Sequence, residues 1–244
     1  MMAATAPSFI FISPRPRPSS EPPSLHEAWL SAINSYFPKD ERIRFSVLES
    51  KLEDIDPALA QCDCMVSPAN TFGIMDGGYD YDLSKVFMGE SGDIMRLSRH
   101  VQRHLHTRWG GYAPPSSCTL VPLPPDVSGP EKNPWGARLL AIVPTMRVPE
   151  DVHWNKDLVY NCMWSLLAEV SLYNRGKEEG ERIERVLMTG LGTGTGQVSK
   201  KVCADQMVLA TKHWLQGLPS ELRWPDVIPR ANEIQETFED KTEY

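Results

Sequence analysis

Short apolar runs alternate along this chain with longer segments in which apolar residues recur every three or four positions. Short apolar runs between turn-forming residues are typical of buried strands, and the periodic segments are typical of helices with one apolar face. Ile43, Phe45 and Val47 instead alternate with polar residues, as in a half-buried strand. The predicted strands are residues 9–12, 43–47, 64–66, 118–121, 139–143 and 186–188.

Five segments have the helical spacing, and the third of them follows Ser91, a residue suited to an N-cap. That helix would bury an apolar face that includes Leu97 and Val101. Its other face carries Arg96, Arg99, Arg103 and Arg108, which we interpret as a solvated surface. The predicted helices are residues 25–37, 79–88, 91–108, 156–173 and 198–215.

This interleaving predicts an α/β fold with a central mixed β-sheet and helices on both faces. We expect a disordered N-terminus over residues 1–8 and a single domain over residues 9–244. Proline-rich loops are predicted at 13–23 and, as a surface excursion, at 122–135. The tail after Pro219 is polar and acidic, and we expect Trp224 and Ile228 to dock back on the domain.

A glycine-rich loop follows the last predicted strand, at residues 189–196, with the sequence Thr-Gly-Leu-Gly-Thr-Gly-Thr-Gly. Glycines let a backbone approach a ligand closely, and the helix that begins beyond them offers unpaired N–H donors. A strand, a glycine loop and a helix start together are typical of a phosphate site. The alternative is a simple turn, which also uses glycine.

A second loop of this kind follows the strand at 64–66 and contains Asn70, Asp76, Gly77 and Gly78. Ligands of open α/β sheets lie at the carboxyl ends of the strands, so two such loops at one edge would form a pyrophosphate site within a nucleotide-sugar ligand. The Asn70 amide can both donate to and accept from sugar hydroxyls. The glycine loop at residues 189–196 has neither the phosphate-loop pattern that ends in Gly-Lys-Ser/Thr nor the dinucleotide pattern of a Rossmann fold.

Composition narrows the choice of partners. The 244 residues carry a net charge of −7, which argues against a protein that binds duplex nucleic acid. The odd number of cysteines, five, favours reduced thiols and a cytoplasmic or nuclear location. There is no run of eighteen apolar residues, so we expect no membrane span, and the apolar run at 9–12 is too short for a signal peptide.

The sequence resembles the macro domains, which bind ADP-ribose. Residues 67–78, Ser-Pro-Ala-Asn-Thr-Phe-Gly-Ile-Met-Asp-Gly-Gly, look like their first ligand loop, and residues 190–196 with 203–207 look like their second loop and the helix after it. Residues 143–149 are similar to a segment of one macro-like subfamily. The resemblance, which spans about residues 45–215, implies a three-layer α/β/α sandwich that binds ADP-ribose or a derivative, on its own or attached to a protein.

The resemblance also implies which residues hold the ligand. Asn70 would contact the distal ribose, and Asp76 stands where the family carries another glycine. The Gly-Asp-Ile motif that reads adenine is not clear: Ser50 and Leu52 lie at its place, whereas residues 53–55 match it better in letters. The implied phosphate and ribose contacts are Gly77, Gly78, Gly192, Thr193, Gly194, Thr195 and Gly196.

Hydrolytic macro domains place an aspartate shortly after these glycines, and Asp80 falls there. Asp80 and Asn70 would then position a water that attacks ADP-ribose 1″-phosphate or mono-ADP-ribosyl protein. The alternatives are a binding module without turnover and a relic without binding, because Asp80 and Asp82 also suit a first helical turn. We expect no cofactor and no metal, since neither Cys62 with Cys64 nor His100 with His104 has further ligands at suitable spacing.

Overall fold

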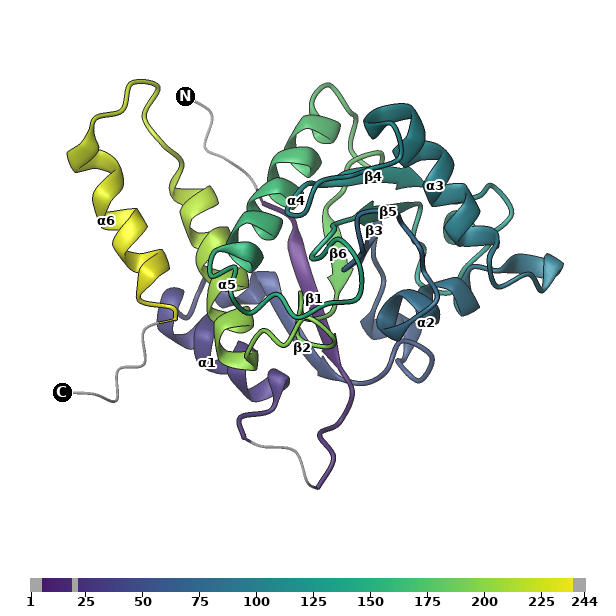
Figure 1. Cartoon of the computed structure of the whole chain (residues 1–244), viewed down its shortest axis with the longest axis horizontal. Coiled ribbons are helices and arrows are strands. Elements are labelled where there is room, and N and C mark those ends of the chain that lie inside the picture. The colour runs from purple at the N-terminus through teal and green to yellow at the C-terminus, as the bar shows by residue number, and fades with distance from the viewer. Residues whose placement is uncertain (1–5, 19–21, 239–244) are drawn as a thin grey trace.

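The computed structural model describes residues 6–18 and 22–238, and an α/β fold with one six-stranded sheet accounts for its core (Figure 1). The strand order is β2-β1-β6-β3-β5-β4, and all pairs are parallel except β4 with β5. The sheet is therefore mixed, as predicted. The strands are β1 (Ser8–Ser13), β2 (Phe45–Glu49), β3 (Cys64–Ser67), β4 (Thr119–Pro122), β5 (Leu139–Ile142) and β6 (Arg185–Met188).

Helices cover both faces of the sheet, so the fold has three layers. Along β1, Phe9 and Phe11 face one layer of helices, whereas Ile10 and Ile12 face the other, because successive side chains of a strand point to opposite sides. The first layer contains α1 (Leu25–Tyr36), α4 (Leu158–Asn174) and α5 (Lys200–Gln216). The second contains α2 (Gly78–Val86) and α3 (Arg96–Trp109).

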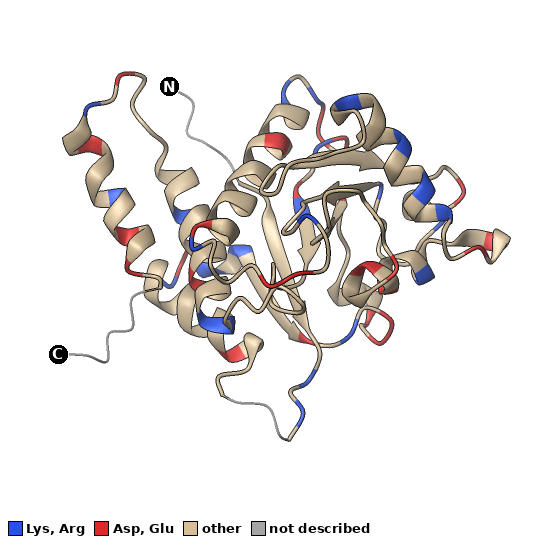
Figure 2. Ribbon diagram, in the orientation of Figure 1, with Lys and Arg blue, Asp and Glu red and all other residues tan. Residues whose placement is uncertain are grey.

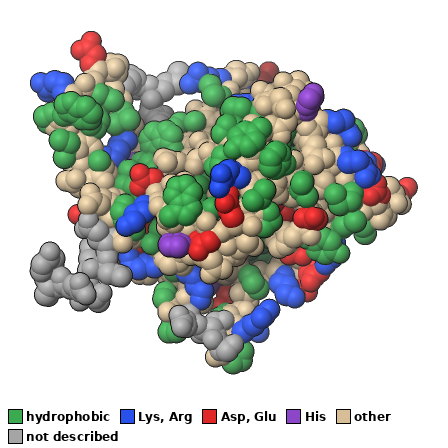
Figure 3. Space-filling model, in the orientation of Figure 1, with side chains coloured by type: hydrophobic (Ala, Val, Ile, Leu, Met, Phe, Trp, Pro, Cys, Tyr) green, Lys and Arg blue, Asp and Glu red, His purple; other side chains and the backbone are tan. Residues whose placement is uncertain are grey.

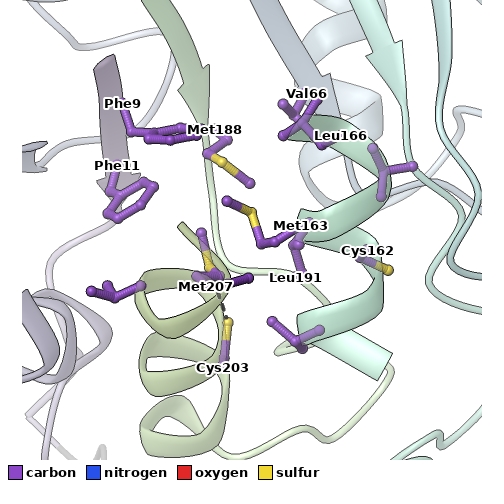
Figure 4. Close-up of a cluster of buried hydrophobic side chains, with 14 of the residues drawn as sticks. Phe9, Phe11, Val66, Cys162, Met163, Leu166, Met188, Leu191, Cys203 and Met207 are labelled. Carbon is purple, nitrogen blue, oxygen red and sulfur yellow. Dashed lines mark hydrogen bonds between the residues drawn. The ribbon is translucent and has the colours of Figure 1, made fainter. Parts of the chain in front are cut away.

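The first layer buries a core rich in sulfur and aromatic side chains (Figure 4). Met188 at the end of β6 points toward Met163 of α4, and Met207 of α5 lies below them. Met207 Sδ also receives a hydrogen bond of 3.4 Å from Trp29 Nε1 of α1. Trp29 is fully buried and stacks on Phe11, so its ring helps to hold α1 to the sheet together with the buried Ala28, Ala32 and Ile33.

The ends of α1 are set by the residues around it. Ser24 Oγ accepts from Glu27 N, and Glu27 Oε2 accepts from Ser24 N, which is a capping box. The chain then turns through a 3₁₀ helix, η1 (Arg42–Arg44), before β2. Ile43 lies in that turn and is 91% exposed, so its predicted place in a strand is wrong.

Two predicted starts were misplaced. Residues 1–5 lie outside the described residues, but Ser8 begins β1 and donates its N–H to Glu184 O (2.8 Å), so it is not disordered. Ser91 is not the N-cap of α3, because it belongs to the 3₁₀ helix η3 (Gly89–Ser91). Gly92 follows with a left-handed φ of 64°, which stops helical propagation, and α3 begins four residues later.

The loop at residues 122–135 is anchored, contrary to the predicted surface excursion. Pro122 ends β4, while Val127 and Trp135 are buried in the second layer. Asn133 Nδ2 donates to the carbonyls of Val127 and Ala137, each at 2.8 Å. In the other proline-rich loop, residues 14–18 are exposed and 19–21 lie outside the described residues.

The polar tail forms a helix that sequence periodicity did not predict, α6 (Trp224–Gln235), on the outer side of α5 (Figure 1). Trp224 and Ile228 are 79% and 50% exposed, so these two residues do not dock as expected. Glu233 docks instead: its Oε2 accepts from Lys212 Nζ at 2.6 Å and lies 3.2 Å from His213 Nε2. Within the described ranges, none of the helices has both the length and the apolarity that a bilayer crossing needs.

Candidate functional site

The two predicted loops meet at one edge of the sheet. They follow β3 and β6, which are adjacent and parallel, with Cys64 opposite Val186 and Met65 opposite Leu187. Parallel neighbours end at the same edge, so Gly77 and Gly194 line one cavity of about 400 Å³ although they are far apart in sequence. Its lining is Pro68, Ala69, Asn70, Ile74, Asp76, Gly77, Gly78, Tyr79, Asp80, Thr145, Met146, Pro149, Thr189, Gly190, Gly192, Thr193, Gly194 and Thr195.

A third segment, which leaves β5, ties the two loops together. Thr145 N donates to Ala69 O (2.8 Å), and Thr71 N donates to Met146 O (3.0 Å), so this segment runs beside the first loop. Val152 N then donates to Gly196 O (3.0 Å), which connects it to the glycine loop. Thr145, Met146 and Pro149 were not predicted to be site residues, although residues 143–149 carried part of the resemblance.

The start of α2 has no side-chain cap. Gly77 is its N-cap residue, and no side chain bonds to the first turn of the helix. Within the described chain, the N–H groups of Gly78 and Tyr79 make no hydrogen bond. Gly78 has a φ of 54°, and a Cβ on Gly77 or Gly78 would meet nothing within 4 Å. The helix start therefore presents unpaired donors at the cavity wall.

The glycine loop supplies further donors from the facing wall. Val198 N bonds to Gly192 O and Gln197 N to Gly194 O, both at 3.1 Å, and these two bonds hold the loop in a tight curve. Over the described part of the chain, the N–H groups of residues 193–195 are unpaired. A Cβ on Gly194 would meet only open space.

Gly196 does not line the cavity. Its Cβ would lie 2.6 Å from Gly192 O and 2.9 Å from Val152 Cγ2, so glycine is needed here because the backbone passes too close for any side chain. The structure thus gives Gly196 a packing role inside the loop, in place of the predicted direct contact.

Asn70 lines the cavity, but its amide mostly holds its own loop. Its Oδ1 accepts from Phe72 N (3.1 Å) and Ile74 N (3.2 Å), and its Nδ2 donates to Ile74 O (2.7 Å). One Nδ2–H remains, because a primary amide has two. A ligand can therefore gain one donor from Asn70, but the oxygen is already occupied.

Asp80 is the one carboxylate in the cavity wall that is almost fully buried, at 7% exposure, among the described residues. Burial raises the pKa of Asp80 to about 7. The hydrogen bond from Ser67 lowers this pKa, and the nearby charge of Asp76 raises it. Ser67 Oγ donates to Asp80 Oδ1 at 2.6 Å. This partner was not predicted, because nothing in the sequence links the last residue of β3 to a helix thirteen positions later.

The predicted Ser50 and Leu52 do not reach this cavity and lie instead in a smaller one of about 200 Å³. Tyr79 and Thr189 belong to both linings, so the two cavities adjoin. The small cavity is lined by Ile12, Pro14, Ser50, Lys51, Leu52, Tyr79, Asp82 and Thr189. Asp82 is thus its carboxylate, and burial raises the pKa of this group above its ordinary value.

The weaker chemical signals in the sequence form no site in the part of the chain that the structure describes. The five cysteines are free and buried, and burial raises the pKa of Cys62 to about 12. His100 Nε2 lies 2.7 Å from Pro122 O, and its ring contacts that of His104. No group of three or more metal-binding side chains occurs in the described ranges.

Known protein-family models and curated proteins were both searched, and neither search finds a match for this sequence.

Proposed function

We propose that this protein is a macro-domain protein that binds ADP-ribose and hydrolyses an ADP-ribose derivative. The observation that supports this most is the convergence of an uncapped helix start and an unpaired glycine loop on one cavity. No Lys or Arg stands among the described residues that line it, so backbone N–H groups would carry the anion. A diphosphate between Gly77 and Gly194 would receive donors from both walls.

The small cavity suits the base of such a ligand. It adjoins the large one, so a nucleotide could extend from one to the other past Thr189 and Tyr79. Leu52 and Ile12 supply apolar walls, and Asp82 could accept from an exocyclic amino group such as that of adenine. Asp82 would then do the work that the sequence resemblance placed in the loop at residues 50–55.

The distal ribose would lie against Asn70 and Asp80. In its ionised form Asp80 would take a proton from a water that attacks the terminal phosphorus of ADP-ribose 1″-phosphate. The P–O bond to the sugar would break, and the proton would pass from Asp80 to the leaving sugar oxygen. The products would be inorganic phosphate and ADP-ribose. With mono-ADP-ribosyl protein, the same water would attack the anomeric carbon and release the protein side chain. Loop N–H groups would stabilise the charge that develops.

The test combines binding with turnover. Calorimetry with ADP-ribose should give saturable binding, and phosphate release from ADP-ribose 1″-phosphate should be lost in Asp80→Ala while binding remains. Mono-ADP-ribosylated protein is assayed in parallel. Full turnover of both substrates by Asp80→Ala would remove Asp80 from the mechanism, and no binding at millimolar ADP-ribose would reject the proposal as a whole.

A binding module without turnover is the second candidate. The occupied Asn70 oxygen favours it, because that atom cannot also orient a water. Asp76 in the cavity wall favours it as well, since its charge would oppose the additional phosphate of ADP-ribose 1″-phosphate, which ADP-ribose itself lacks. Tight ADP-ribose binding without product after long incubation would support this candidate, and robust turnover of either substrate would exclude it.

A further inference from the structure

The outer face of α3 is strongly basic, although the chain as a whole carries a net charge of −7. Residues 96–109 include four arginines and three histidines and no acidic residue. Figure 2 shows the resulting row of blue along α3, and Figure 3 shows blue and histidine side chains on the surface in that region. A positively charged face on an otherwise acidic protein is a candidate binding surface for an anionic partner.

Three of these arginines are already paired. Arg96 binds Asp126 with two hydrogen bonds, of 2.7 and 2.5 Å, and Arg108 binds Glu169 at 2.5 and 3.1 Å. Arg99 pairs with Asp93. Arg103 is exposed and forms no ion pair with any residue that the structure describes. It is therefore the cation that remains available on this face.

Arg103 lies between two grooves. The larger, of about 730 Å³, is lined by Phe72, Arg99, Gln102, Arg103, His106, Thr107 and Gly111. The smaller, of about 440 Å³, runs on the other side of Arg103 toward Thr119 and Leu120 of the edge strand β4. An extended chain that crosses α3 would thus meet Arg103 from either side.

The larger groove also has an apolar component that reaches the candidate site. Phe72 is 39% exposed and meets the ring of Tyr112 edge to face at 5.7 Å. Phe72 belongs to the same loop as Asn70 and Ile74, which line the large cavity. A single loop therefore separates the groove from the place where the distal ribose would lie.

We propose that this groove binds an acidic polypeptide segment, namely the part of a protein substrate that flanks the ADP-ribosylated side chain. The inference depends on the proposed function for the identity of the modified group, but the groove itself is independent of it. Arg103, with the partly neutralised Arg99, would pair with one or two carboxylates. Phe72, with the ring of Tyr112 packed beside it, would cover an apolar side chain.

A peptide fits this surface better than a nucleic acid does. Affinity for nucleic acid grows with the number of phosphates that cations neutralise, and here three of four arginines are engaged by carboxylates of the protein. The net charge of −7 would repel a long polyanion. A short segment with few carboxylates and one apolar side chain can be bound by the one or two cations and the exposed Phe72 ring of the groove.

The experiment measures two affinities on the same full-length protein. The probes are a short fluorescein-labelled peptide of glutamates interspersed with leucines, read by anisotropy, and unlabelled ADP-ribose, read by calorimetry. Arg103→Glu should weaken the affinity for the peptide on the order of tenfold and leave the affinity for ADP-ribose unchanged. An exposed ion pair contributes little by itself, but the reversed charge adds repulsion between the new carboxylate at position 103 and the peptide. Thr107→Glu, which adds charge to the same groove, should act in the same direction.

Lys39→Glu is the matched control, since Lys39 is exposed beyond α1 at the opposite edge of the sheet. Unchanged peptide affinity in both groove variants, or no peptide binding by the wild type, would overturn the docking surface. So would tighter binding of a single-stranded oligonucleotide that Arg103→Glu abolishes. If the peptide binds as expected and ADP-ribose does not, the docking surface stands and the proposed function falls.

Discussion

Ser67 Oγ donates a 2.6 Å hydrogen bond to Asp80 Oδ1; both residues are buried, and Asp80 lines the large cavity. The bond joins the end of β3 to the first turn of α2. It opposes the burial that raises the pKa of Asp80 to about 7, because a hydrogen bond to a carboxylate favours the charged form. Ser67 therefore lowers the pH at which Asp80 ionises.

The first prediction concerns the rate of phosphate release from ADP-ribose 1″-phosphate. In the wild type the rate should rise with pH through a midpoint near 7, because the carboxylate is the active form. Ser67→Ala should move that midpoint up by about one pH unit, since a hydrogen bond to a charged group contributes about 1.5 kcal/mol. Initial rates across the pH range measure this.

Ser84→Ala is the control for that shift. Ser84 Oγ donates a buried bond of 2.8 Å to Met75 O, so the variant loses a hydrogen bond in the same helix without touching Asp80. Its pH midpoint should equal that of the wild type. A common midpoint for the wild type and Ser67→Ala would contradict the role of Ser67.

The second prediction concerns stability. The pKa of Asp80 is raised, so the folded state holds its proton more tightly than the unfolded state, and stability is lost as pH rises toward 7. Asp80→Asn removes that loss and should raise the free energy of unfolding at pH 8 by about 2–4 kcal/mol, with little effect at pH 4. Urea unfolding at both pH values measures it, with the exposed Asp40→Asn as control. Equal effects of Asp80→Asn at both pH values would refute the prediction.

The third prediction tests the glycine loop. A side chain at Gly194 enters open space at the cavity, so Gly194→Glu should fold normally and lose at least about a hundredfold in ADP-ribose affinity through bulk and like charge. Gly194→Ala, which adds one methyl group to the same open space, should lose far less. Calorimetry compares the two variants. Wild-type affinity in Gly194→Glu would mean that the ligand lies elsewhere.

The fourth prediction concerns the docking of α6. Burial lowers the pKa of His213 to about 4, while Tyr160 Oη lies 3.0 Å from Nδ1 and Glu233 contacts Nε2. A lowered pKa gives stability that is present above the unfolded value of about 6.5 and is lost as pH falls toward 4, by about 3 kcal/mol in total. Urea unfolding from pH 7 to pH 4 should show that loss.

His213→Gln should be less stable than the wild type at pH 7 and should have a flatter dependence on pH. The exposed His106→Gln serves as control and should keep the wild-type slope. An unchanged slope in His213→Gln would show that His213 does not titrate between the two states.

The sheet and most helices could be predicted because local patterning decides them. Met65 and Leu187 lie in short apolar runs that are typical of buried strands, and both lie in central strands here. The start of the helix predicted at residues 91–108 was wrong. Ser91 and Gly92 end the 3₁₀ helix η3, and Asp93 Oδ1 accepts from Met95 N just before α3 begins. Helix α6 was missed although Val227, Ala231 and Ile234 have helical spacing, because Pro229 lies inside it and proline is normally a sign against a helix interior.

The sequence predicted which backbone segments line the candidate site better than it predicted the contacts of the side chains there. Glycines at 77, 78 and 194 line the cavity as expected, because glycine at a strand end has a narrow set of uses. The occupied amide of Asn70 and the placing of Asp82 in the small cavity were not predicted. Both depend on distances between groups that are not neighbours in the chain.

By itself, the order of residues determined the alternation of strands and helices and marked two glycine loops as special, because both properties are local. It could not decide that β6 lies beside β3, which brings Gly194 to Gly77. Nor could it decide that Ser67 meets Asp80, or that Arg103 forms no ion pair in the described chain while Arg96, Arg99 and Arg108 do. These relations depend on how separated segments pack, and the packing is fixed only when the whole sheet forms.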